Sequence, residues 1–134
     1  MSVKQSGKLS DAARRVLDGK NFATVATVNA DGAPQSSVVW VTRDGDALLF
    51  STRTERKKAR NLARDSRISV SIFDADNPYY SAEIQGRAEL IEDPEGALRA
   101  RLAQKYLGQD PGPEPDTARL IVRVVPERIT EHSG

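Results

Sequence analysis

The residues of this 134-residue chain that could do chemistry together lie between Ser51 and Arg60. Two hydroxyl residues, Ser51 and Thr52, end an apolar segment, and five cations follow: Arg53, Arg56, Lys57, Lys58 and Arg60. Hydroxyl groups, free backbone N–H groups at a helix start and flexible cations together suit a phosphate. Basic residues early in a helix oppose its dipole and therefore favour a nearby anion. The segment predicts an anion site; the alternative is the solvated charged face of an amphipathic helix.

This basic segment is hidden by an overall charge close to zero. The chain carries 20 Lys and Arg against 19 Asp and Glu, a formal net charge of +1. Residues 53–67 contain seven of the basic residues but, of the acidic ones, only Glu55 and Asp65. A nucleic-acid surface usually makes the whole domain basic, and the aromatic residues that stack on bases make up only 5% of this chain. The pattern favours a local anion site over an RNA-binding barrel.

Several catalytic chemistries lack their residues here. Cysteine is absent and His132 is the only histidine, which argues against thiolate chemistry, a Ser/His/Asp triad and a histidine metal site. There is no glycine-rich phosphate loop or dinucleotide fingerprint. The carboxylates that could form a glycosidase pair fit a solvated rim better: Asp74, Asp76, Glu83, Glu89, Glu92, Asp93 and Glu95. If the chain is an enzyme, we expect a bound organic cofactor to supply the chemistry, with no catalytic side chain and no metal.

Strand signals recur about every ten residues and predict the elements that must position the site. A flexible tail is expected at residues 1–9, followed by a helix that Ser10 caps and Gly19 ends. Further helices are expected at 54–65 and from Asp93-Pro94 to Gly108. The expected strands are 22–28, 35–42, 47–52, 68–73, 79–91 and 117–125.

These elements predict one mostly β (α+β) domain over residues 10–134, with six antiparallel strands and short flanking helices. Such a sheet avoids exposed edges most easily by closing into a barrel. Residues 36–41 and 120–122 are partly apolar on both faces, so a second copy of the chain is the expected cover, giving a homodimer. No apolar run reaches the roughly 20 residues of a membrane span, and residues 1–8 contain no apolar signal region. A cytoplasmic protein without a membrane partner is therefore expected.

Four segments together carry a family resemblance. They are Ala23–Pro34, the stretch from Phe50-Ser51-Thr52 to Lys57-Lys58-Ala59-Arg60-Asn61-Leu62, Ile84–Leu90 and Val124–Ile129. In this order they resemble the opening hairpin, the phosphate-binding segment, the long strand and the final strand of the pyridoxamine 5′-phosphate oxidase-like, flavin-binding split-barrel superfamily. The resemblance spans roughly residues 10–130.

The resemblance implies a homodimeric split β-barrel with a cofactor at the subunit interface. The residues that it assigns to the cofactor phosphate are Ser51, Thr52, Lys57 and Lys58, with Arg53 as a further cofactor-binding cation. Those that it places along the flavin or deazaflavin ring are Ser36, Ser37 and Val38. The residues that it implies approach the cofactor across the dimer interface are Tyr79 and Tyr80.

The second strand departs from the pyridoxamine phosphate oxidases themselves. Those enzymes resemble one another in a basic Arg-x-Val-Leu-x-Lys pattern, whereas Ser37-Val38-Val39-Trp40-Val41 contains no cation. What remains resembles the short branch that uses the 8-hydroxy-5-deazaflavin coenzyme F420, whose phosphodiester and polyglutamate tail suit the five cations. The resemblance thus implies an oxidoreductase that transfers a hydride from reduced coenzyme F420 to a small molecule. An FMN-dependent reductase or oxidase, and a non-catalytic flavin or deazaflavin carrier, are the alternatives.

Overall fold

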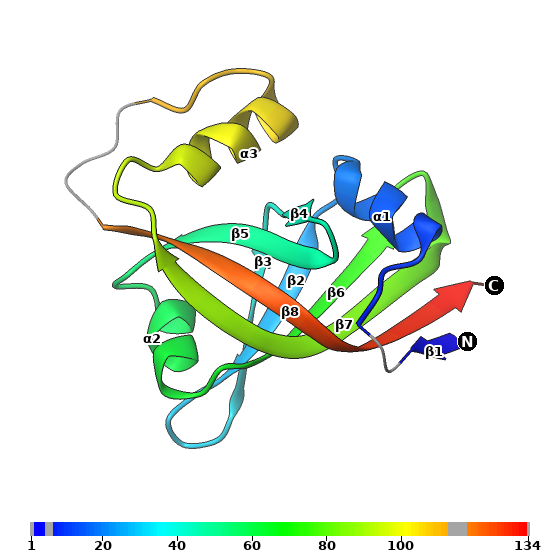
Figure 1. The fold of residues 1–134 in the computed structure, drawn as a ribbon, viewed down its shortest axis with the longest axis horizontal. Helices are drawn as coiled ribbons and strands as arrows, with labels where there is room; N and C mark the ends of the chain where they lie inside the picture. The colour runs from blue at the N-terminus through cyan, green and yellow to red at the C-terminus, as the bar shows by residue number, and fades with distance from the viewer. Residues whose placement is uncertain (1, 5–6, 113–117, 134) are drawn as a thin grey trace.

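The computed structural model describes residues 2–4, 7–112 and 118–133. One antiparallel sheet follows the order β3-β2-β6-β7-β8-β5-β4, and β1 pairs with β8 outside this path (Figure 1). The strands are β1 (Ser2–Lys4), β2 (Ala23–Val28), β3 (Pro34–Val39), β4 (Thr42–Asp44), β5 (Ala47–Arg53), β6 (Arg67–Asp74), β7 (Asn77–Glu92) and β8 (Arg119–Ser133). The helices are α1 (Asp11–Asp18), α2 (Lys57–Arg64) and α3 (Ala97–Leu107).

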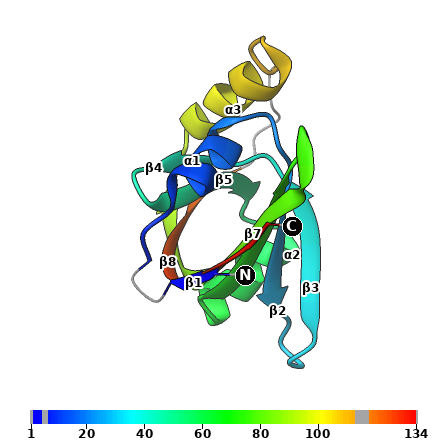
Figure 2. The same ribbon diagram turned by 90° about the vertical axis from the view of Figure 1, so that its right-hand side faces the viewer.

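The sheet curls around the main hydrophobic core, as the view in Figure 2 shows. Phe50, Ile72, Ile84 and Ile129 are fully buried inside it, and α1 adds Leu17. The two ends of the strand path, β3 and β4, do not pair with each other in the described part of the chain. The mostly β class is therefore confirmed, and the sheet is curled but not closed.

The expected number of six strands is wrong, because the described residues form eight. The predicted strand 35–42 breaks at Trp40 and Val41. Before the break the chain is β3, which pairs with β2 at one edge of the sheet; after it the chain is β4, which pairs with β5 at the other edge. The hydroxyl of Tyr106 accepts a hydrogen bond from the backbone N–H of Val41 (3.2 Å), and the ammonium of Lys105 donates to the Val41 carbonyl (2.7 Å). A helix therefore supplies the partners that a neighbouring strand would otherwise provide.

The eighth strand, β1, lies within the segment expected to be a tail. Ser2–Lys4 pairs with residues 129–131 of β8, and the side chain of Leu9 is buried in the core. Residues 1, 5 and 6 lie outside the described part of the chain, as does Thr117, where the last strand was expected to begin.

α1 begins where the sequence predicts, whereas α2 and α3 begin about three residues later than predicted. The prediction that Ser10 caps α1 is confirmed, because its hydroxyl accepts a hydrogen bond from the backbone N–H of Ala13 (3.1 Å). By contrast, α3 begins after Gly96 rather than at Asp93-Pro94. The Asp93 carboxylate accepts hydrogen bonds from the backbone N–H groups of Ala97 and Leu98, both at 3.0 Å. A carboxylate from outside the helix thus caps its first turn.

The long strands β7 and β8 bend where Gly86 faces Pro126. The pairing register shifts between Gln85 and Gly86, and a Cβ atom at position 86 would lie 2.0 Å from the carbonyl oxygen of Val125. Pro126 has no N–H to donate to a neighbouring strand, and it lies where the regular pairing is already interrupted. The close approach of the two backbones therefore requires glycine at position 86.

We expect Gly86→Ala to lower the free energy of unfolding by about 2 kcal/mol or more, because the added methyl group must push β7 and β8 apart. The measurement is chemical denaturation followed by circular dichroism. Gly112→Ala is the matched control, since nothing lies within 4 Å of a Cβ atom at that position. Equal stabilities of the two variants would contradict the explanation given for Gly86.

Candidate functional site

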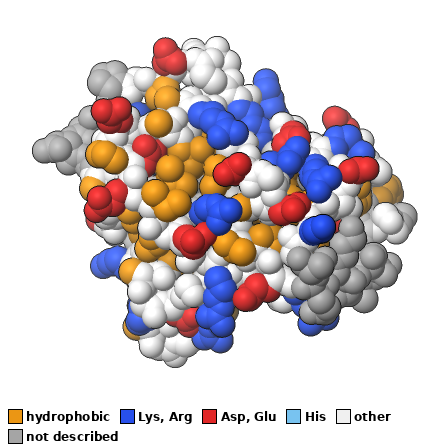
Figure 3. All heavy atoms as spheres, in the orientation of Figure 1, with side chains coloured by type: hydrophobic (Ala, Val, Ile, Leu, Met, Phe, Trp, Pro, Cys, Tyr) orange, Lys and Arg blue, Asp and Glu red, His pale blue; other side chains and the backbone are white. Residues whose placement is uncertain are grey.

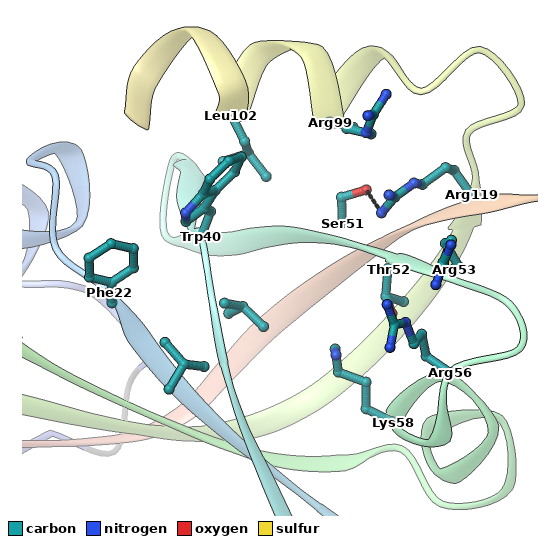
Figure 4. A pocket seen from close by; sticks show the side chains of 12 residues that line it. Phe22, Trp40, Ser51, Thr52, Arg53, Arg56, Lys58, Arg99, Leu102 and Arg119 are labelled. Atoms are coloured by element: carbon teal, nitrogen blue, oxygen red, sulfur yellow. Dashed lines mark hydrogen bonds between the residues drawn. The ribbon is translucent and has the colours of Figure 1, made fainter. Parts of the chain in front are cut away.

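A pocket of about 500 Å³, the main pocket, opens where β3, β5, α3 and the start of α2 come together (Figure 4). Its lining residues are Phe22, Val38, Val39, Trp40, Ser51, Thr52, Arg53, Arg56, Lys58, Arg99, Leu102 and Arg119. The rings lie toward one end of the pocket and the cations toward the other. The pocket can therefore hold a ligand with a flat apolar part and an anionic part.

The apolar end is built on a stack of three aromatic rings. Tyr106 of α3 lies between Phe22 and Trp40, with ring centroids 5.6 Å and 5.3 Å away. The hydroxyl of Tyr106 donates to the backbone carbonyl of Asn21 (2.6 Å), which holds the ring in place. Phe22, Trp40 and the neighbouring Val38 thus present apolar surface to the pocket, with Val38 65% exposed.

The cationic end gathers five positive side chains, and no Asp or Glu is among the described residues of the lining. Arg53, Arg56 and Lys58 come from the end of β5 and the start of α2, whereas Arg99 comes from α3 and Arg119 from β8. Glu55, which lies outside the lining, forms an ion pair with Arg53 (3.0 Å). Elsewhere charges of both signs are interspersed (Figure 3), and Arg123 pairs with Glu89 at 2.6 Å. Within the described part of the chain, the excess of positive charge is thus local to the pocket.

Two hydroxyl groups lie among these cations. Arg119 donates to the Oγ atom of Ser51 at 3.4 Å (Figure 4). The Oγ1 atom of Thr52 is buried and has no hydrogen-bond partner within the described residues. A buried hydroxyl without a partner is costly, and a phosphate oxygen would be a suitable acceptor for it. This observation supports the prediction that Thr52 belongs to an anion site.

The ammonium of Lys58 is the cation whose protonation the pocket affects most clearly. Partial burial lowers its pKa from the ordinary value of 10.5, and the positive charges of Arg56 and Arg119 lower it further. A bound phosphate would offset both effects. The charged form of Lys58 is therefore disfavoured in the absence of an anion.

The structure separates Lys57 from Lys58. Successive residues of a helix point about 100° apart, so that Lys57 lines a second groove of about 410 Å³ on the other side of α2. We call this the outer groove; Asn29, Ala30, Asp31, Lys57, Arg60, Asn61 and Arg64 line it. The cations predicted as one phosphate site are thus divided between two adjacent grooves.

The predicted ring-binding residues on β3 lie along a single edge strand. Val38 lines the main pocket, whereas Ser36 and Ser37 do not. The Oγ atom of Ser37 is buried without a hydrogen-bond partner among the described residues, and Ser36 is exposed. Their alternation follows from the two faces of a strand.

Tyr79 and Tyr80 lie outside the main pocket of their own chain. Tyr80 is buried and donates a hydrogen bond to a carboxylate oxygen of Glu131 (2.7 Å). Burial and this bond raise the pKa of the Tyr80 hydroxyl. Tyr79 points the opposite way and is 74% exposed. The single chain thus gives Tyr80 a structural role and leaves Tyr79 free for contact with another molecule.

Sequence reasoning did not assign Phe22, Arg99, Leu102 or Arg119 to the site. Arg99 and Leu102 are on α3, which folds over β5 from more than 45 positions later in the chain. Arg119 reaches the site because β8 pairs with β5, Arg119 itself opposite Arg53. No local pattern announces these contacts. Among the described residues, no group of His, Cys, Asp and Glu side chains could hold a metal ion, and no helix is long and apolar enough to cross a membrane.

The curled antiparallel sheet agrees with the fold that the sequence resemblance implies. Consistent with this, a family model described as pyridoxamine 5′-phosphate oxidase matches residues 9–133. The chain belongs to this family, whose fold is that of flavin-binding oxidoreductases, and the resemblance in the sequence is confirmed.

Individual relatives agree on the fold and differ in their names. A pyridoxine/pyridoxamine 5′-phosphate oxidase from Kineococcus radiotolerans is 30% identical over 99 residues, 74% of this chain and 43% of the relative, so the chain spans less than half of that protein. A structure named F420 reductase is 32% identical with a TM-score of 0.84, covering 91% of this chain and 98% of the other. A conserved hypothetical protein from Mycobacterium tuberculosis is 25% identical with a TM-score of 0.77, covering 93% and 85%.

The lowered pKa of Lys58 predicts the pH dependence of phosphate binding. Only the protonated ammonium attracts the anion, so the affinity for FMN should fall as the pH rises through the lowered pKa, at a lower pH than an ordinary lysine at 10.5 would cause. Titrations between about pH 7 and pH 10 measure this. Lys58→Arg should remove the fall, since arginine stays charged. An unchanged pH profile in that variant would exclude Lys58 as its origin.

Proposed function

We propose that the protein is an oxidoreductase that binds reduced coenzyme F420 in the main pocket and transfers a hydride to a small-molecule substrate. The observation that carries the proposal is the joining of an apolar, aromatic wall to five cations, with no carboxylate among the described residues of the same lining. Such a pocket matches a planar ring that ends in a phosphorylated chain. The proposed partners are the cofactor, a small substrate and a second copy of the chain, in the cytoplasm, with neither nucleic acid nor membrane.

The residues present fit the two parts of such a cofactor. Arg56, Lys58 and the hydroxyl of Thr52, which has no partner among the described residues, would hold the phosphodiester. Val38 and Trp40 would contact the ring, with the backbone of β3 beside it. When bound, the reduced deazaflavin supplies the hydride. The protein's part would be to orient the ring, to exclude water through the apolar wall, and to hold the anionic chain away from the reacting face.

The outer groove favours coenzyme F420 over FMN. FMN has a single phosphate group, which the main pocket could neutralise by itself, whereas the polyglutamate tail of coenzyme F420 adds several carboxylates. Lys57 and Arg60 lie beside the phosphate-binding helix turn and are exposed, so they could pair with that tail. The structural neighbour named F420 reductase also favours this assignment. FMN-dependent reduction or oxidation, and cofactor carriage without catalysis, are the alternatives.

A homodimer would complete the site. Large apolar side chains are exposed on three strands of the sheet: Val38 on β3, which also lines the main pocket, Phe73 on β6 and Tyr79 on β7. Exposed apolar groups on neighbouring strands often mark an interface. A second copy seated on this face would cover them and could bring its Tyr79 toward the cofactor.

The test of the cofactor uses the fluorescence of Trp40, the single tryptophan of the chain, which lines the main pocket. The apo-protein is titrated with coenzyme F420 and with FMN in parallel. We expect micromolar or tighter binding of coenzyme F420 and weaker binding of FMN. The opposite preference would assign the protein to the FMN branch. Binding of neither would contradict the proposed function.

Single substitutions separate the two cationic grooves. Lys58→Ala should weaken the binding of both cofactors about tenfold, because the phosphate loses a charge-assisted contact. Lys57→Ala should weaken only coenzyme F420 with its polyglutamate tail and leave FMN unchanged. Fluorescence titration of both variants with both cofactors measures this. Equal effects of Lys57→Ala on the two cofactors would rule out the tail assignment.

Light scattering tests the dimer, with an expected mass of about twice the 14.7 kDa of one chain. Tyr79→Ala should leave the fold intact and weaken both association and cofactor binding. A monomer at micromolar concentration would remove the partner's contribution from the proposal.

A further inference from the structure

The helix that carries the phosphate-binding cations has little to hold it by local forces. α2 has eight residues, no side-chain hydrogen bond at its N-cap Arg56 and no acidic residue in its first turn. Cations at a helix start oppose the helix dipole, and an isolated helix of this length is marginal in water. The position of α2 must therefore be determined by tertiary contacts.

Asn61 makes the most specific of these contacts. Its side chain is 3% exposed, and its amide nitrogen donates to the Oγ1 atom of Thr27 (3.0 Å) and to the Oδ1 atom of Asn29 (2.9 Å). The guanidinium of Arg64 donates to the amide oxygen of Asn61 (3.0 Å) and also to the carbonyl of Val28. Both donors of the amide and one acceptor position are used. The amide thus joins α2 to the end of β2 and to the β2–β3 turn.

These bonds fix the rotation of α2 about its own axis. The apolar contacts of Ala59 and Leu62 with the interior are not directional, whereas the hydrogen bonds of a buried amide require particular angles. Lys58 and Lys57 lie three and four positions before Asn61, one turn along the helix. A rotation of α2 by one residue, about 100°, would turn Lys58 out of the main pocket and could put Lys57 in its place.

We propose that Asn61 is a positioning residue for the phosphate site: its buried amide sets the rotation of α2 and so directs Lys58 into the main pocket and Lys57 into the outer groove. The inference rests on the proposed function, because it concerns the phosphate site of the same cofactor. Asn61 itself lines the outer groove and does not line the main pocket.

The test compares matched ligands that differ only in the phosphorylated part. FMN and riboflavin form one pair, and coenzyme F420 and its deazaflavin core without the phosphodiester chain form the other. For each protein we take the dissociation constant of the ligand without phosphate divided by that of the phosphorylated ligand. This ratio is large when the phosphate is held well. The pair used is the one whose ring the wild-type protein binds. A general loss of stability changes both affinities together, whereas a displaced cation changes the ratio.

We expect Asn61→Ala to reduce this ratio about tenfold, with the affinity for the ligand without phosphate nearly unchanged. Asn29→Ala removes one acceptor of the Asn61 amide from a surface turn and should reduce the ratio in the same direction. If Asn61→Ala does not fold, this second variant decides. Ser10→Ala is the matched control, because it removes the cap of α1 and should lower the thermal midpoint without changing the ratio.

The outcomes separate the two proposals. A wild-type ratio close to one would show that no phosphate is held, which would overturn the proposed phosphate site together with the role of Asn61. A wild-type protein that prefers the phosphorylated ligand, with folded Asn61→Ala and Asn29→Ala variants that keep the same ratio, would overturn the positioning role alone. A reduced ratio in these variants but not in Ser10→Ala would support it.

Discussion

The hydrogen bonds that α3 makes to the backbone of Val41 are the interaction on which the site depends. At Trp40 and Val41 the chain passes from one edge of the sheet to the other, and the buried N–H and C=O groups of Val41 need partners there. Tyr106 and Lys105 supply them. The same two residues hold α3 over β5, with Tyr106 stacked on Trp40 and Lys105 also donating to the carbonyl of Leu17. Meeting a backbone requirement thus brings together β3, β5 and α3, the elements that form the apolar end of the main pocket.

The cationic end is a compromise between folding and binding. Mutual repulsion of cations and a helix start without a cap both disfavour the empty site. Burial, and then the charges of Arg56 and Arg119, lower the pKa of Lys58 in the same sense. The hydrogen bonds of Asn61 and the burial of Ala59 and Leu62 stabilise α2 against this repulsion. An anionic cofactor would reduce the repulsion between these cations, so its binding and the stability of the site are linked.

Local signals predicted the elements well where one residue determines the local structure. Ser10 at the start of α1 and the basic face of α2 were found because capping and helical periodicity act over a few residues. The start of α3 was misplaced because Asp93 caps it from outside the helix, so the proline that follows is not its first residue. The number of strands was wrong for two reasons: the break at Trp40 depends on a helix more than 60 residues away in the chain, and β1 forms by pairing with the distant β8.

The sequence by itself determined the mostly β class and the family. It also predicted an anion site in residues 51–60, because hydroxyl residues, cations and a helix start are contiguous there. Only the tertiary structure decided how that segment is used. It divided Lys57 from Lys58, added Arg99, Leu102 and Arg119 to the lining, and placed Tyr80 in the core. The physical reason is that side-chain direction and long-range strand pairing depend on the packing of the whole sheet, which no run of neighbouring residues encodes.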